Sequence, residues 1–304
     1  MKVPWTGVYP AVTTKFTSDD QLDLETFEMN ILAQLNAGVE GIVLGGTLGE
    51  ASSLADSEKI ILLKSAVALV KGKVPVIMNI AEQTTKEAIH AVKQAELYGA
   101  SGLMILPPMR YKACDRETVA YYKTVAASTD LPIMIYNNPV DYKIEITLDM
   151  FEELAECENI QAVKESTRDV TNVTRMINRF GDRYKVLCGV DTLALESLLM
   201  GADGWVAGLV CAFPKETVAI YKLAKAGRNE EALKIYRWFL PLLELDINSK
   251  LVQNIKLAEV ATGLGTEYVR APRLALVGKE REEVLEIINR GLKSRPSLPD
   301  YLNL

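Results

Sequence analysis

The sequence of 304 residues is poor in the side chains on which many enzymes depend. His90 is the only histidine, so Ser-His-Asp or Cys-His catalysis would depend on that one residue, and a histidine-rich metal site is excluded. The four cysteines lie far apart and form no Cys-x-x-Cys pair, the spacing typical of zinc sites and redox motifs. We therefore expect reduced thiols and no metal.

Positive charge and long apolar runs are also scarce. Lysine and arginine number 34 against 40 acidic residues, which gives a net charge of −6, so nucleic acid is not an expected partner. The apolar run 60–70 is interrupted by Lys64 and falls short of the roughly 20 residues that a membrane span needs. The first residues lack the apolar segment of a signal peptide. We expect a cytoplasmic protein without a membrane partner.

Eight short runs rich in β-forming residues recur along the first two thirds of the chain. Most are continuously apolar, which is typical of parallel strands covered on both faces. The content of 49% hydrophobic residues is enough for a large core. The predicted strands are 8–14, 41–47, 75–81, 102–107, 132–137, 160–165, 185–190 and 204–208.

The segments between these runs carry helix signals. Thr84 and Glu87 form a capping-box pattern before a helix over 88–98, and Gly99 follows as a stop. Gly38 closes another predicted helix just before a strand. The repeated strand–helix unit favours an α/β fold of the (β/α)8 TIM-barrel type over an open doubly wound sheet.

No strand is predicted after residue 208, where four amphipathic helices follow instead. One of them must complete the last strand–helix unit. We therefore predict a barrel over residues 1–225 and a C-terminal helical extension over 226–304, packed together as one structural unit. The predicted helices are 215–225, 230–246, 251–263 and 280–293.

Polar residues that follow apolar strands are the first candidates for an active site, because barrel enzymes build their sites at the carboxyl ends of the strands. Lys164, Tyr136 and Thr47 hold such positions. A lysine enclosed by apolar strand ends has a lowered pKa and a nucleophilic amine. The hydroxyl groups could relay protons. Alternatively, the lysine leaves the barrel mouth for water, the tyrosine packs on a loop and the threonine caps a helix.

The turn at 45–50 is rich in glycine and offers backbone N–H groups that could hold a carboxylate. It matches neither the dinucleotide-binding glycine pattern nor the phosphate-binding loop, so it gives no support for a nucleotide cofactor.

Four segments together, 46–50, 136–139, 163–166 and 189–191, resemble the dihydrodipicolinate synthase/N-acetylneuraminate lyase family. The similarity covers nearly the whole chain and includes the order and spacing of the motifs. It implies a homotetrameric, cofactor-free barrel of the class I aldolase type. In such a barrel Lys164 would be the Schiff-base lysine, Tyr136 the proton-transferring tyrosine, and Thr47 a member of the same relay.

The resemblance also implies how the substrate is bound. Backbone groups of Thr47 and Leu48 would hold its carboxylate, and Gly189 and the Val206 carbonyl would line the same pocket. The substrate would be a small 2-oxo or cyclic 2-imino acid.

Three positions depart from the pattern of the synthase. Leu48 stands where the synthase has a second threonine, and Met109 stands where a relay tyrosine from the partner subunit is expected. Asp141 replaces an arginine that binds the carboxylate of the second substrate. These changes favour a smaller substrate than that of the synthase.

The segments 105–112, 136–139 and 204–208 are similar to the hydroxyproline-catabolic branch of the family. In that branch, 1-pyrroline-4-hydroxy-2-carboxylate is deaminated to 2,5-dioxopentanoate and ammonia. The alternatives are a 2-keto-3-deoxy acid aldolase or dehydratase, the synthase itself, and an inactive ligand-binding barrel.

Four further residues carry smaller predictions. Trp205 is expected in the core, and Glu165 is expected on the outer face of its strand, away from Lys164. Arg110 and Tyr111 are either substrate contacts or loop residues.

Overall fold

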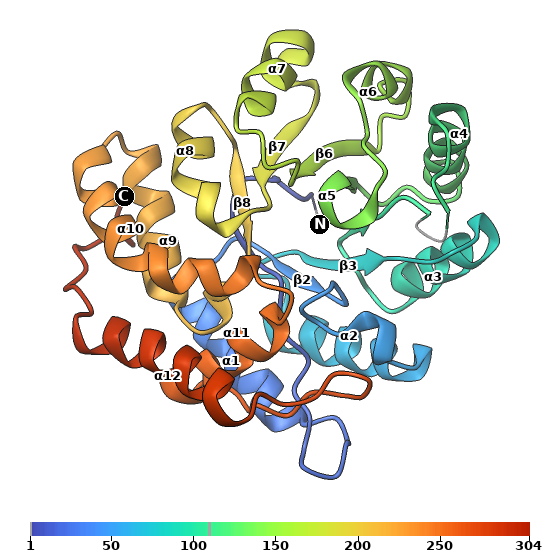
Figure 1. The fold of residues 1–304 in the computed structure, drawn as a ribbon. Helices are drawn as coiled ribbons and strands as arrows, with labels where there is room; N and C mark the ends of the chain where they lie inside the picture. The colour runs from blue at the N-terminus through green and yellow to red at the C-terminus, as the bar shows by residue number, and fades with distance from the viewer. Residues whose placement is uncertain (1, 109–110) are drawn as a thin grey trace.

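Eight parallel strands form a closed barrel surrounded by helices, in a computed structural model that describes residues 2–108 and 111–304 (Figure 1). Each strand pairs with its neighbours in the sequence, β1 pairs with β8, and a bridge between Ala11 and Val43 joins β1 to β2. The predicted (β/α)8 fold is confirmed. The strands are β1 Gly7–Pro10, β2 Ile42–Leu44, β3 Val76–Ile80, β4 Gly102–Ile105, β5 Ile133–Asn137, β6 Ile160–Glu165, β7 Lys185–Cys188 and β8 Gly204–Ala207.

Burial on both faces explains the apolar strands. All five residues of β3 are buried, as parallel strands between a barrel interior and a helical layer require. Several strands are shorter than predicted because the chain turns into loops at their carboxyl ends. β2, for example, ends at Leu44 because Gly45 adopts a φ of 66°, a left-handed conformation that takes the chain out of the strand.

Helices alternate with the strands and cover the outside of the barrel. The capping prediction for α3 is confirmed, since Thr84 accepts a hydrogen bond from the Glu87 N–H and Gly99 follows with a φ of 92°. The helices are α1 Leu24–Ala37, α2 Asp56–Val70, α3 Thr85–Leu97, α4 Asp115–Ala126, α5 Pro139–Tyr142, α6 Leu148–Leu154, α7 Thr171–Phe180, α8 Ala194–Leu199 and α9 Pro214–Lys225, with short 3₁₀ helices η1 Ala51–Ser53, η2 Gly181–Arg183, η3 Asp191–Leu193 and η4 Leu209–Cys211.

The C-terminal helices pack on one side of the barrel, drawn in orange and red in Figure 1. α9 contacts β1, β8 and α1, so it completes the last strand–helix unit. It is followed by α10 Asn229–Leu243, η5 Glu244–Ile247, α11 Leu251–Thr262 and α12 Gly278–Lys293. The helix predicted over 230–246 ends earlier, because its last turn tightens into η5. The predicted division of the chain into a barrel up to residue 225 and an extension from residue 226 stays a proposal.

Two buried ion pairs tie this extension to the barrel. Lys15, in the loop after β1, lies 2.7 Å from Glu259 of α11, and Lys256 of α11 lies 2.5 Å from Glu50 in the glycine turn. All four side chains are fully buried. Within residues 2–108 and 111–304, no helix has the length and apolar character needed to cross a bilayer.

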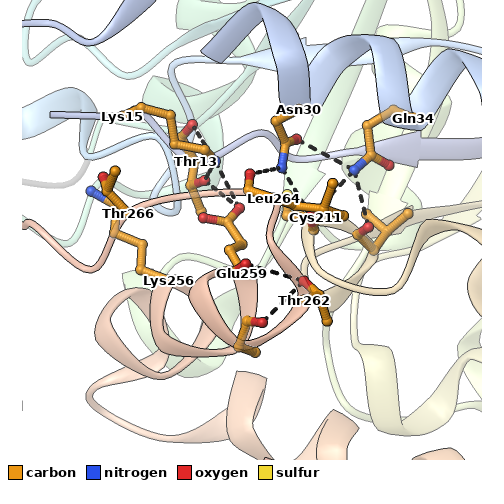
Figure 2. A network of polar contacts seen from close by, with 12 residues as sticks. Thr13, Lys15, Asn30, Gln34, Cys211, Lys256, Glu259, Thr262, Leu264 and Thr266 are labelled. Atoms are coloured by element: carbon orange, nitrogen blue, oxygen red, sulfur yellow. Dashed lines mark hydrogen bonds and ion pairs between the residues drawn. The ribbon is translucent and has the colours of Figure 1, made fainter. Parts of the chain in front are cut away.

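Polar contacts from α1 extend this network (Figure 2). Asn30 donates hydrogen bonds to the carbonyls of Cys211 and Leu264, and Gln34 donates to the carbonyl of Val210. Figure 2 shows Lys15 and Thr13 converging on Glu259. The network therefore joins the first helix, the loop after the last strand and the extension.

We expect replacement of Lys15 by Met to destabilise the protein strongly, because Glu259 then keeps a buried charge without its counter-ion. The expected loss is about 3 to 5 kcal/mol of the free energy of unfolding, and the double variant Lys15→Met/Glu259→Leu should recover most of it. Urea denaturation at fixed protein concentration measures both. Lys279→Met, which removes a lysine from the exposed pair with Glu283, is the control. A loss no larger than the control's contradicts the prediction.

Candidate active site

A cavity of about 440 Å³ opens at the carboxyl ends of the strands. The loops after the strands form most of its wall, and the segment from η5 to the start of α11 forms the rest. All the residues predicted for the site line this one cavity: Thr47, Leu48, Tyr136, Lys164, Gly189 and Val206.

Lys164 lies near the end of β6, directly across from Tyr136 on β5. It is only 7% exposed, and its Nζ lies 4.1 Å from the centre of the Tyr136 ring. Burial lowers the pKa of Lys164, while Tyr142, Asp246 and Asp191 nearby oppose this shift. Unlike Lys15, the side chain forms no ion pair with any described residue. The geometry therefore favours a neutral, nucleophilic amine.

Gly189 leaves room for this lysine. A Cβ atom at position 189 would come within 2.6 Å of Cε of Lys164 and 2.2 Å of Oγ of Ser166, so any larger residue would displace them. Val206, on β8, is 1% exposed and lines the cavity. Small or apolar residues on β8 and after β7 thus leave space beside the amine.

Two neighbours of the site face elsewhere, as predicted. Glu165 accepts hydrogen bonds from the Thr167 N–H at 2.8 Å and from Nδ2 of Asn172 at 2.7 Å, on the helix side of the barrel. Trp205 is completely buried and donates its Nε1–H to Asp191. Neither lines the cavity.

Tyr136 presents a protonated phenol to the cavity. Its hydroxyl accepts a hydrogen bond of 3.2 Å from Nδ2 of Asn138, and burial raises the pKa of Tyr136 to about 12. The phenol is therefore a proton donor at neutral pH, close to Lys164.

Thr47 is hydrogen-bonded to a residue that the sequence analysis missed. Its Oγ1 lies 2.7 Å from the hydroxyl of Tyr142, the last residue of α5. The Tyr142 ring meets the Tyr136 ring edge-on, at 5.5 Å between centroids. Burial raises the pKa of Tyr142 above its ordinary value. The two hydroxyls form a path along which a proton could move between the cavity and the glycine turn.

A sequence signal for Tyr142 did exist. Asn138 followed by Pro139 is a helix-start pattern, and the Asn138 side chain caps α5 by accepting from the Asp141 N–H. One turn of helix after β5 brings Tyr142 back over the barrel mouth.

The glycine turn fits the predicted binding of a carboxylate. The backbone N–H groups of Thr47 and Leu48 have no acceptor in the described part of the chain, and Leu48 is 5% exposed. Adjacent backbone N–H groups without acceptors at a cavity wall are suited to an anionic oxygen.

Acidic side chains also reach the cavity. Asp141 lines it, accepts a hydrogen bond of 2.7 Å from Asn138, and lies 3.8 Å from Arg168. Asp246, from η5, lines the same cavity. No group of three or more His, Cys, Asp or Glu side chains among the described residues is arranged as a metal site.

Met109 and Arg110 lie outside the described residues. Tyr111 is 55% exposed and does not line the cavity, which agrees with a loop position rather than a substrate contact.

Comparisons with known proteins agree with this geometry. The pattern of the dihydrodipicolinate synthetase family matches residues 4–290. A 4-hydroxy-tetrahydrodipicolinate synthase of Exiguobacterium sibiricum is 34% identical over 271 residues, which are 89% of this chain and 92% of that protein. A "Probable 2-dehydro-3-deoxy-D-pentonate aldolase" of Escherichia coli is 28% identical over 93% of this chain and 96% of its own length.

Solved structures show the same architecture. The 4-hydroxy-tetrahydrodipicolinate synthase of Methylacidiphilum fumariolicum superposes with a TM-score of 0.90 at 28% identity, over 95% of this chain and 96% of the other. The chloride-inhibited dihydrodipicolinate synthase of Acinetobacter baumannii, complexed with pyruvate, has a TM-score of 0.90 at 26% identity, over 94% and 98%. The chain therefore belongs to the dihydrodipicolinate synthetase family, whose members are class I lyases built on a (β/α)8 barrel.

Proposed function

We propose that the protein forms a Schiff base between Lys164 and a small 2-oxo or cyclic 2-imino acid. The observation that carries this proposal is the buried amine of Lys164, which lacks an ion pair among the described residues and faces a cavity beside the Tyr136 phenol. Pyruvate, which is bound in the Acinetobacter baumannii structure, and the 2-dehydro-3-deoxy acid in the name of the Escherichia coli relative are both 2-oxo acids. An inactive ligand-binding barrel would not need such a costly buried amine.

The geometry suggests a role for each group. The backbone N–H groups of Thr47 and Leu48 hold the substrate carboxylate, which places the adjacent carbon at Nζ of Lys164. Tyr136 donates a proton to the departing oxygen or nitrogen at that carbon. We assign proton exchange at the cavity to the hydroxyl pair of Thr47 and Tyr142, whose tyrosine ring meets the Tyr136 ring edge-on, so both hydroxyls of the pair come from this chain.

We further propose that the substrate is 1-pyrroline-4-hydroxy-2-carboxylate. Arg168 at the cavity lies 3.8 Å from Asp141, so this arginine is already paired and is not free to bind a second substrate carboxylate. Such a wall disfavours a second substrate carboxylate, on which the synthase reaction depends. A five-carbon acid with one carboxylate and otherwise polar, uncharged groups suits it better.

The proposed reaction balances with one net molecule of water. Nζ of Lys164 bonds to C2, and the bond from C2 to the ring nitrogen breaks. Loss of a C3 proton gives an enamine, which expels the C4 hydroxyl as water. Loss of a C5 proton and return of protons to C3 and C4 then convert the C5 amine into an imine. Two waters release ammonia from C5 and 2,5-dioxopentanoate from Lys164.

Two other activities share the same lysine. The Escherichia coli relative favours cleavage of a 2-keto-3-deoxy acid, and the Exiguobacterium sibiricum relative favours the synthase. A homotetramer, as the family resemblance implies, is our proposal for the assembly.

Borohydride reduction in the presence of pyruvate should attach a reduced pyruvate adduct to Lys164, seen by intact-mass and peptide mass spectrometry. Because the pKa of Lys164 is lowered, the rate of trapping should reach its plateau at a lower pH than that of an ordinary lysine. Lys164→Ala should give no adduct, and Lys93→Ala, on the exposed face of α3, should behave as wild type. An adduct on another lysine would refute the assignment.

Purified protein should release ammonia from 1-pyrroline-4-hydroxy-2-carboxylate, and Lys164→Ala should not. The same preparation is assayed for pyruvate release from 2-keto-3-deoxy acids and for condensation of pyruvate with aspartate semialdehyde. Ammonia release as the fastest activity supports the deaminase. Faster release of pyruvate would establish the aldolase, and faster condensation would establish the synthase.

Tyr142→Phe should lower kcat about 100-fold, because it removes one hydroxyl of the proton path while keeping the ring against Tyr136. Steady-state kinetics on the substrate found above measure the effect. Tyr111→Phe, outside the cavity, is the matched control and should be neutral. If Tyr142→Phe keeps more than a third of the wild-type kcat, the path does not run through Tyr142.

A further inference from the structure

Asp246 brings a carboxyl group from the C-terminal extension into the candidate active site. It belongs to η5 and lines the same cavity as Lys164 and Tyr136. Its Oδ1 is buried and has no hydrogen-bond partner within residues 2–108 and 111–304. A buried oxygen without a partner is costly, so it calls for a functional explanation.

The fold holds this carboxyl group in place. A Cβ atom at Gly208 would come within 2.5 Å of Oδ1 of Asp246, so a glycine after β8 is needed to admit the side chain. Nδ2 of Asn254, on α11, donates to the carbonyl of Leu245 and fixes the backbone of η5. The extension therefore does more than cover the barrel, because it delivers one residue to the cavity.

A second buried carboxyl group, that of Asp191, has the opposite environment. It accepts hydrogen bonds from Nε1 of Trp205 at 2.9 Å and from the N–H groups of Gly208 and Leu209, at 3.1 and 2.8 Å. Burial raises the pKa of Asp191, and these three donors oppose that shift by stabilising the ionised form. No such donors reach Oδ1 of Asp246 in the described chain.

The two carboxyl groups are therefore unequal. Burial and the charge of Asp191 raise the pKa of Asp246 well above its ordinary value, with Asp141 adding to the effect and Lys164 opposing it. When two carboxyl groups interact in a buried site, the one without donors keeps the proton. Asp246 is then a neutral acid near Lys164.

We propose that Asp246 is the general acid that protonates the hydroxyl group leaving C4 of the substrate, an inference that rests on the proposed deaminase function. The electron pair of the enamine bound to Lys164 moves toward C4, the bond from C4 to oxygen breaks, and the oxygen leaves as water with the Asp246 proton. The carboxylate then takes a proton from C5, which gives an extended enamine from C2 to C5, and protons returning to C3 and C4 convert the C5 amine into an imine. This step returns Asp246 to its starting form.

The other acids near the cavity suit this step less well. Tyr136 lies against Lys164, where it serves C2, and its pKa of about 12 makes it a weaker acid than a carboxyl group. Asp141 has partners of its own, since it accepts a hydrogen bond from Asn138 and lies 3.8 Å from Arg168. Asp246 is the carboxyl group that lacks such partners.

The test compares Asp246→Asn with wild type in two assays. Asparagine keeps the size of the side chain and removes the acidic proton. Glu244→Gln removes one acid from an exposed position of the same 3₁₀ helix and is the matched control. The first assay is ammonia release from 1-pyrroline-4-hydroxy-2-carboxylate. The second is borohydride trapping, with pyruvate and with that substrate, followed by mass spectrometry.

We expect Asp246→Asn to lose roughly 100-fold or more in kcat for ammonia release, with pyruvate trapping within twofold of wild type. With the hydroxypyrroline substrate, its trapped adduct should be the ring-opened species that still carries the C4 hydroxyl. That adduct is heavier by one water than the dehydrated adduct expected from wild type. Glu244→Gln should match wild type in every assay.

Three results overturn the proposal in distinguishable ways. Ammonia release by Asp246→Asn within threefold of wild type removes the acid role while leaving the deaminase intact. Loss of both ammonia release and pyruvate trapping shows that Asp246 supports Lys164 or the fold rather than departure of the hydroxyl. Wild-type protein that traps pyruvate yet releases no ammonia refutes the deaminase function, and the role of Asp246 with it.

Discussion

Burial of the Lys164 amine without a paired carboxylate is the constraint to which the rest of the site is fitted. A lysine in an apolar environment loses its hydration and favours the neutral form, while a carboxylate in direct contact would restore the charge. The described residues around Lys164 place no carboxylate in direct contact with its amine. An aromatic ring lies against its Nζ, and a glycine leaves space beside its methylenes.

The same chain shows what happens when buried lysines are paired. Lys15 and Lys256 are as deeply buried as Lys164, yet each contacts a glutamate, and both join the extension to the barrel. Their ammonium groups are ion-paired with glutamates, so they are not available as nucleophiles. All three lysines are buried, so burial alone does not distinguish them. The difference is the ion pair, which the two lysines that anchor the extension form and Lys164 does not form with any described residue.

The sequence was sufficient to predict the parts that follow a periodic rule. Alternating strands and helices predicted the barrel, and strand-end positions predicted Lys164, Tyr136 and Thr47, because in a barrel such positions converge at one end. The resemblance added Leu48, Gly189 and Val206, and all six residues line one cavity. Strand lengths were overestimated, since apolar runs continue into the turns where glycine conformations end the strands.

Tyr142 and Asp246 were missed because no periodic rule places them. Tyr142 depends on a single turn of helix after β5, and Asp246 on the point where α10 tightens into η5. Asp246 had been assigned to the end of a regular helix, where an acidic residue is usually solvated. Its arrival in the cavity depends on packing between segments far apart in the chain, which sequence spacing does not encode.

The location of these two residues bears on how one barrel can serve several reactions. Activation of a 2-oxo or 2-imino carbon requires only groups near Lys164, and these come from the strands. Discrimination among substrates requires groups farther from that carbon, and here these come from α5 and η5, which are short helical turns outside the barrel strands. Side chains on such connecting segments can change without disturbing the barrel. The acid–base character of the outer cavity can therefore diverge while the lysine chemistry stays the same, and in this chain η5 contributes the carboxyl group of Asp246 to that part of the cavity.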